Sequence, residues 1–130
     1  DDAAGTLLEN MVLMGKLNWI TCKLTHGNRL EDMLGLTSED MQWIKDNRGK
    51  LLDYLKAHYN STDPQVLRNL LNNTYNPTIG GKRSPGLLGV WVGFQMVNQY
   101  MKNHQHLSLQ ELATSNNVAE IAAAYNYNIE

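Results

Sequence analysis

Residues 84–103 read SPGLLGVWVGFQMVNQYMKN, and this stretch decides the fold because its apolar residues recur with the spacing of a helix. Steps of four, three and four separate the residues on one face: Val90, Phe94, Val97 and Met101. A stripe of this kind is buried when the helix packs against its neighbours. The stretch therefore predicts a long helix opening at Pro85 and Gly86, and we expect it to be the central, most buried one.

Glycines form a second strip on the same helix, at Gly86, Gly89 and Gly93. Each glycine inside a helix costs roughly 1 kcal/mol relative to alanine, so a helix that holds several has a use for the missing side chains. We expect a structural groove here that lets another backbone approach closely, with Leu87 and Trp91 on its flanks.

The composition indicates a single helical domain over residues 1–130, since 42% of the residues are hydrophobic and 18% are charged. The net charge is −2 and no basic stripe is present, which argues against nucleic-acid binding. No run of 18 apolar residues occurs, so no membrane-spanning helix is predicted. Cys22 is the only cysteine, which excludes an intrachain disulfide, and its apolar surroundings predict a buried, inert thiol.

The remaining pattern predicts an all-α fold, an irregular bundle of about six helices around the glycine-grooved helix. The expected helices span about residues 3–24, 37–60, 63–73, 86–102, 109–114 and 118–124. Two of the expected helices begin with the residue types of a capping box, which are Thr37 with Asp40 and Ser108 with Glu111. The first helix is apolar over more than half its circumference, which predicts burial between neighbours.

The segment PGLLGVWVGFQMVNQYM resembles the P-G-x-x-G-x-W-x-G-x-x-x-V-x-x-Y-M segment of the gliding-motility lipoprotein GldB family. Weaker matches flank it. Residues 11–16 fit a helix ending in Met-x-x-x-Gly-Lys, and residues 37–43 fit a threonine-started helix with an early tryptophan. Ser108, Leu109 and Leu112 fit a Ser-Leu-x-x-Leu helix. The resemblance covers most of the chain and corresponds to the C-terminal half of the family's full length.

This resemblance implies a lipid-anchored protein of the periplasm or cell envelope, related to proteins classed as zincin-type zinc-dependent proteases. The chain begins DDAAGT, without an initiator Met or a signal-peptide pattern, so we expect the C-terminal helical part of a longer lipoprotein. Zinc would then be held only by ligands of an upstream domain. Asn10 stands where relatives are expected to carry a glutamate, and Tyr125–Asn128 replace a basic ending. Both departures make inherited metalloenzyme activity less expected.

The residues themselves predict no catalytic, cofactor-binding or metal-binding group. Neither H-E-x-x-H nor H-x-x-E-H occurs. His104 and His106 are two residues apart, which on a helix points their side chains in opposite directions, and His26 and His58 stand alone. Cys22 has no adjacent histidine in the sequence to form a dyad.

Two regions are candidate contact sites. Lys82 and Arg83 come shortly before Gly86, where two cations and the free N–H groups of a helix start could hold an anion, although a solvated loop explains the same residues. The candidate partner-binding surface consists of Trp43, Tyr125 and Tyr127. Trp19 and Trp91 are expected in the core.

Three functions remain open at this point. The chain is interpreted first as a non-catalytic domain that supports an upstream domain or binds a partner protein. The alternatives are the C-terminal subdomain of a zinc peptidase whose metal-binding helix lies elsewhere, and an independent helical interaction module. Any membrane contact is expected only through an upstream lipid anchor. If part of the protein is missing, we expect an apolar face of the first helix to be exposed and the chain to form a homodimer that covers it.

Overall fold

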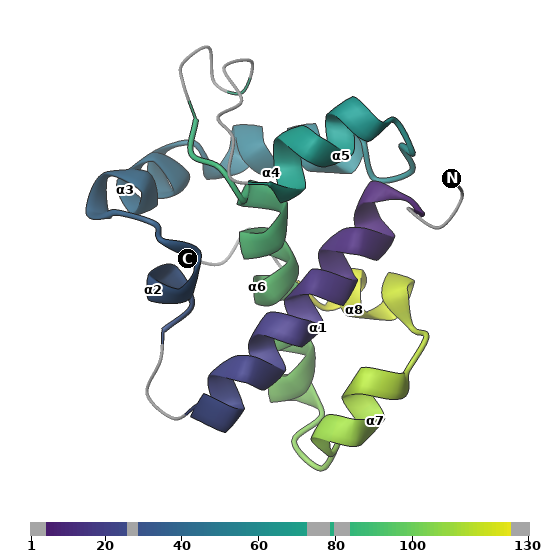
Figure 1. Ribbon diagram of the computed structural model, residues 1–130. Coiled ribbons are helices and arrows are strands. Elements are labelled where there is room, and N and C mark those ends of the chain that lie inside the picture. The colour runs from purple at the N-terminus through teal and green to yellow at the C-terminus, as the bar shows by residue number, and fades with distance from the viewer. Residues whose placement is uncertain (1–4, 26–28, 73–78, 80–83, 126–130) are drawn as a thin grey trace.

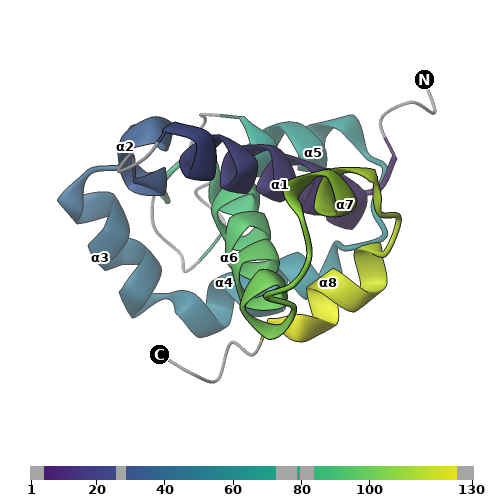
Figure 2. The same ribbon diagram turned by 90° about the horizontal axis from the view of Figure 1, so that it is seen from below.

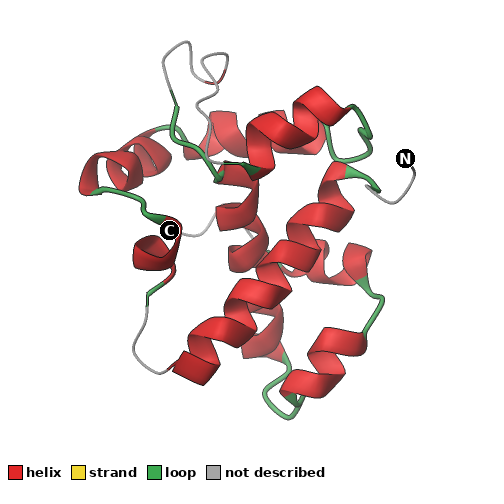
Figure 3. Ribbon diagram, viewed as in Figure 1, coloured by secondary structure: helices red, strands yellow, loops and turns green. Residues whose placement is uncertain are grey.

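Helix α6, Leu88–Asn103, lies in the middle of the molecule with the other helices around it (Figures 1 and 2). The structure is a computed structural model and describes residues 5–25, 29–72, 79 and 84–125. Ten of the sixteen residues of α6 are buried, which confirms the prediction of a central, buried helix. Within the described residues the secondary structure is helical without strands, so the predicted all-α class is also confirmed (Figure 3).

The described residues form eight helices, two more than predicted. In chain order they are α1 (Leu7–Thr25), α2 (Leu30–Leu34), α3 (Ser38–Asp46), α4 (Arg48–Ala57), α5 (Pro64–Leu71), α6 (Leu88–Asn103), α7 (Leu109–Thr114) and α8 (Val118–Ala124). Helix α1 crosses α6 and makes the most extensive contact with it, and α5 and α8 also pack on α6. Helices α2 and α3 lie on one side of this crossing and α7 and α8 on the other (Figures 1 and 2).

The crossing of α1 over α6 is a contact between backbones, made possible by glycines. A Cβ atom added to Gly15 of α1 would lie closer than 3.0 Å to the backbone of Gly93 in α6. A Cβ atom added to Gly93 would overlap the carbonyl oxygen of Met11. Gly89 allows α5 to approach α6 closely in the same way. A Cβ atom added to Gly89 would lie 2.8 Å from the carbonyl oxygen of Leu70.

The predicted start of the central helix at Pro85 and Gly86 is wrong, because α6 begins at Leu88. The preceding Leu87 has the left-handed backbone conformation, with φ 63° and ψ 24°, which the sequence did not indicate. Its N–H donates to the carbonyl oxygen of Asn72 at 3.0 Å, which ties the start of α6 to the end of α5. Gly86 is buried but lies outside the helix.

The predicted single helix over residues 37–60 is also wrong, because Asn47 divides it into α3 and α4. Both the backbone N–H and the side-chain Nδ2 of Asn47 donate to the carbonyl oxygen of Trp43, at 2.9 Å each. Asparagine readily leaves helical geometry because its side chain competes for nearby backbone groups. The apolar period continues on both sides of the break, so periodicity alone could not reveal it.

Capping boxes start α3 and α7 as predicted, and a third box was missed. Thr37 with Asp40, and Ser108 with Glu111, exchange hydrogen bonds between side chain and backbone in both directions. The missed box is Thr6 with Glu9. It places the start of α1 at Leu7, rather than at the predicted Ala3, which lies outside the described residues.

Replacing Ser108 with alanine should lower the free energy of unfolding by about 1 kcal/mol, the usual effect of removing an N-cap. Ser38→Ala is the matched control, because Ser38 is exposed at the start of α3 and Thr37 is the cap there. Urea unfolding followed by circular dichroism would measure both variants. Equal stabilities for the two would contradict the cap assignment.

The capping box of Ser108 and Glu111 also makes a small part of the free energy of unfolding depend on pH. The Ser108 backbone N–H, donating to Oε1 of Glu111 at 2.8 Å, and the Ser108 hydroxyl hold the pKa of Glu111 below its usual value of 4.5. The stabilisation is therefore complete above pH 4.5 and is lost as the pH falls through the lower folded-state value. We expect Glu111→Gln to reduce this acid-dependent loss of stability relative to the unchanged chain.

Candidate functional site

A cavity of about 590 Å³ opens between the α2–α3 connection, helix α3 and the first turns of α4 and α6. Among the described residues, its apolar lining includes Leu36, Met41, Ile44 and Trp91. Polar and charged side chains complete the wall, among them Arg29, Lys45 and Arg48. The combination of an apolar floor with a few polar groups is typical of a small-ligand site.

The indole of Trp91 is the most informative part of this wall. Only 7% of the residue is exposed, and its Nε1 is buried with no hydrogen-bond partner in the described part of the chain. A buried donor without a partner costs about 1–3 kcal/mol. The sequence predicted Trp91 as a core residue beside the glycines, and it is buried, but its place in a cavity wall was not foreseen.

Arg48 connects the cavity to the far end of the described chain. Its Nη2 donates to the Tyr125 hydroxyl at 2.8 Å, and the guanidinium carbon lies 6.0 Å from the centre of the tyrosine ring. Tyr125 is half-buried, so this contact fixes the residue after α8 against α4.

The other two members of the predicted partner surface are Trp43 and Tyr127. Trp43 is half-buried and packs against the core. Its Nε1 is also buried without a hydrogen-bond partner among the described residues. Tyr127 lies outside the described residues. The structure therefore leaves the proposed joint surface of Trp43, Tyr125 and Tyr127 as a prediction.

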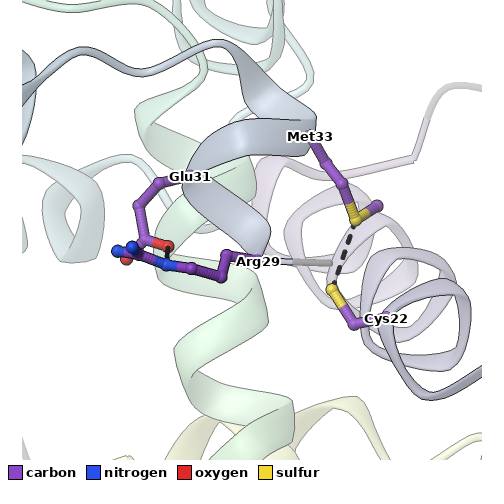
Figure 4. Close-up of polar contacts among 4 residues, drawn as sticks. All are labelled: Cys22, Arg29, Glu31 and Met33. Carbon is purple, nitrogen blue, oxygen red and sulfur yellow. Dashed lines mark hydrogen bonds and ion pairs between the residues drawn. The ribbon is translucent and has the colours of Figure 1, made fainter. Parts of the chain in front are cut away.

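The rim of the cavity carries an ion pair between Arg29 Nε and Glu31 Oε1 at 3.6 Å (Figure 4). The Arg29 side chain is 71% exposed, so this pair adds little to stability. Glu31 nevertheless offsets the charge of Arg29 at this edge.

Cys22 is half-buried, which corrects the prediction of a buried thiol. Its Sγ lies 3.3 Å from Sδ of Met33 in α2, within the range of a weak S–H hydrogen bond (Figure 4). Partial burial, together with the negative charge of Glu31, raises the pKa of the Cys22 thiol. The thiol is therefore protonated at neutral pH, which disfavours a role as a nucleophile.

Most of the predicted anion contact lies outside the residues that the structure describes. Lys82 and Arg83 lie outside the described residues, and Gly86 is buried before the start of α6. The contact stays a prediction.

Two histidines, His58 and His104, contact the backbone one turn earlier in the chain. Nδ1 of His58 and of His104 lies 2.8 and 2.9 Å from the carbonyl oxygens of Tyr54 and Tyr100, one turn earlier in each case. The His104 and His106 rings are 6.5 Å apart between centroids, and His26 lies outside the described residues. No three His, Cys, Asp or Glu side chains of the described residues come together as metal ligands.

Lys16 is a feature that the sequence did not indicate. Its side chain is charged, yet the residue is only 6% exposed. Nζ donates to the backbone oxygen of Ser115 at 2.8 Å and contacts its Oγ at 3.1 Å, just after α7. Burial lowers the pKa of Lys16. The contact joins α1 to the segment between α7 and α8.

The outer face of α1 carries apolar side chains that nothing in the described structure covers. Leu13 and Leu17 are each 54% exposed and Leu24 is 64% exposed. With half-buried Ile20 they form one stripe at steps of four, three and four. We call these four residues the α1 stripe. The prediction that α1 is buried on all its apolar sides is therefore wrong, whereas an exposed apolar face on this helix had been expected for part of a longer protein.

Comparison with known families gives a match to the family described as gliding motility protein GldB, over residues 1–129. The chain belongs to the GldB family of gliding-motility lipoproteins. The match confirms the resemblance read from the PG-G-W-G segment, and it does not bear on a zincin relationship. Searches of curated proteins and of solved structures found no match for this GldB-family chain.

Trp91 belongs to the segment that carries the resemblance to the family, and it is also part of the cavity wall. No helix among the described residues has the length and apolar character needed to cross a bilayer.

Proposed function

We propose that this GldB-family chain is a non-catalytic helical domain of the cell envelope that binds protein through the α1 stripe. The partner surface is either another domain of the same lipoprotein or a separate protein. The supporting observation is the exposure of Leu13, Leu17 and Leu24 on a single helix face. Exposed apolar side chains gathered in this way are typical of protein-binding surfaces.

The energetics of the stripe indicate the strength of contact to expect. Each leucine is already about half-buried, so covering the rest gains about 1 kcal/mol per side chain. The stripe alone therefore supplies about 3 kcal/mol, which is small against the cost of association. Self-association of the isolated chain should be weak, and a tight complex would need further contacts from the partner.

The test is a triple variant, Leu13→Gln, Leu17→Gln and Leu24→Gln, studied by sedimentation velocity over a range of concentrations. We expect the unchanged chain to self-associate weakly at high concentration and the triple variant to stay monomeric. Glutamine is a good helix former, so we expect the triple variant to stay folded, and a thermal melt would measure this.

A matched control replaces three exposed residues elsewhere: Glu39→Gln, Lys50→Gln and Asp53→Asn. This control should associate like the unchanged chain. A monomeric unchanged chain at high concentration would contradict the expected homodimer. Equal association of the triple variant and the unchanged chain would contradict the proposed role of the stripe.

The zinc-peptidase alternative stays a prediction about a longer polypeptide. It expects an H-E-x-x-H helix in the full-length protein and stoichiometric zinc in metal analysis of that protein. Full-length protein without either would remove this alternative and leave the binding role.

A further inference from the structure

We propose that the cavity beside Trp91 binds an organic monocarboxylate, a ligand with one anionic end and an apolar body. The cavity volume of about 590 Å³ lies within the range of 300–1,000 Å³ that is usual for small-molecule sites. Its lining comes from α2 to α4 and α6 and includes no residue of the α1 stripe. The proposal therefore stands apart from the protein-binding role.

The unpartnered donor of Trp91 is the first argument. The residue is more than nine-tenths buried, it forms part of the cavity wall, and its Nε1–H has no acceptor in the described structure. An indole N–H can only donate, so a ligand group that hydrogen-bonds to it must present an oxygen or another acceptor. A carboxylate oxygen is the strongest acceptor of this kind in ordinary metabolites and peptides.

The charge balance of the wall is the second argument. Among the described residues that line the cavity, Arg29, Lys45 and Arg48 are cations, and Glu31 and Asp32 are carboxylates. Glu31 lies 3.6 Å from Arg29 and offsets its charge at the rim. The excess of a single positive charge suits a monoanion better than a phosphate dianion.

The position of Arg48 is the third argument. The hydrogen bond from Nη2 to the Tyr125 hydroxyl holds the guanidinium beside the cavity. Arginine keeps its charge at every physiological pH and offers several donors in one plane. A guanidinium held in this way can bind a carboxylate without losing much side-chain entropy.

The apolar floor defines the rest of the ligand. Leu36, Met41, Ile44 and Trp91 give side chains of different shapes, and methionine adapts to irregular surfaces. Such a floor fits an aromatic or branched aliphatic body, whereas a small polar acid such as formate would leave it uncovered.

The experiment titrates the full 130-residue chain with two probes, N-acetylphenylalanine and its neutral amide, by isothermal calorimetry and NMR. We expect the acid to bind with shifts of amide signals around Met41 and Trp91, and the amide to bind at least about ten-fold more weakly. Octanoate forms a further arm. Binding of octanoate over the acetylated amino acid indicates a lipid-derived carboxylate, and the reverse order indicates a peptide end.

Three variants locate the site. Trp91→Phe keeps an aromatic ring but removes the N–H donor, and should weaken acid binding roughly ten-fold. Lys45→Gln, at an exposed site, should weaken it about three-fold, and Lys50→Gln, which does not line the cavity, should have no effect. Thermal melts establish that each variant is folded.

The proposal is overturned if the acid and the amide bind equally, or if Trp91→Phe and Lys50→Gln give the same affinity. Absence of binding by every probe up to about 10 mM, a range that still detects affinities of about −3 kcal/mol, overturns it too.

Discussion

Replacing Gly93 with alanine should lower the free energy of unfolding by about 3 kcal/mol or more, and the melting temperature by about 10 °C or more. The added Cβ would overlap the carbonyl oxygen of Met11, which belongs to the backbone of α1 and cannot rotate away. The two helices would have to separate, and the packing of both on the core would loosen. Alanine gains roughly 1 kcal/mol in helix propensity, too little to offset this.

Gly49→Ala is the matched control for this prediction. Gly49 also lies in a helix, α4, but an added Cβ there meets no atom within 4 Å. Its stability should be unchanged or slightly raised, because alanine is the better helix former. If Gly93→Ala proved as stable as Gly49→Ala, the close crossing of α1 and α6 would be disproved.

A double variant tests whether Gly15 and Gly93 act at one contact. Gly15→Ala alone should destabilise the chain as well, since its Cβ would meet the backbone of Gly93. Either change already forces the helices apart, so the double variant should cost less than the two single effects added together. Urea unfolding of all four chains would measure this coupling.

Replacing Lys16 with alanine should lower the free energy of unfolding by about 2–3 kcal/mol. The change removes the hydrogen bond from Nζ to the Ser115 carbonyl oxygen and leaves that oxygen without its charged donor. It also removes the buried stem of the lysine. Lys16→Met keeps a stem of similar length and should lie between the alanine variant and the unchanged chain.

Lys50→Ala is the control for a lysine at an exposed site and should change stability by less than about 0.5 kcal/mol. A Lys16→Ala variant as stable as this control would show that the contact with Ser115 contributes nothing.

Alkaline pH gives an independent test of the burial of Lys16. Burial lowers the folded-state pKa of Lys16 below 10.5. At pH values between that lower pKa and 10.5, the unfolded chain therefore binds more protons than the folded one. The contribution of Lys16 to stability should therefore rise with pH between its folded-state pKa and 10.5, where the buried amine becomes neutral. Lys16→Met should lack this rise when its unfolding is compared with that of the unchanged chain.

The central helix could be predicted because its signals are local. Apolar residues and glycines with helical spacing are visible within residues 84–103, and the structure places both against neighbouring helices. The capping boxes at Thr37 and Ser108 were visible for the same reason, since each needs only two residues three apart.

The features that the sequence did not reveal depend on distant segments. The burial of Lys16 requires Ser115, which is far away in the sequence, and the cavity at Trp91 requires α3 to stand beside α6. The left-handed conformation of Leu87 is set by its bond to Asn72, because leucine has no intrinsic preference for it. The candidate ligand site therefore became visible only with the helices assembled.

The meeting of Gly15 with Gly93 has a consequence for synthesis on the ribosome. The first helix lacks its principal packing partner until the segment containing Gly93 has emerged, since that partner is α6. Contacts between such remote segments carry a large loop-closure cost and slow the search for the native topology. Nascent chains ending before α6 would therefore expose the apolar surface of α1, and a holding chaperone would be of most use during that interval.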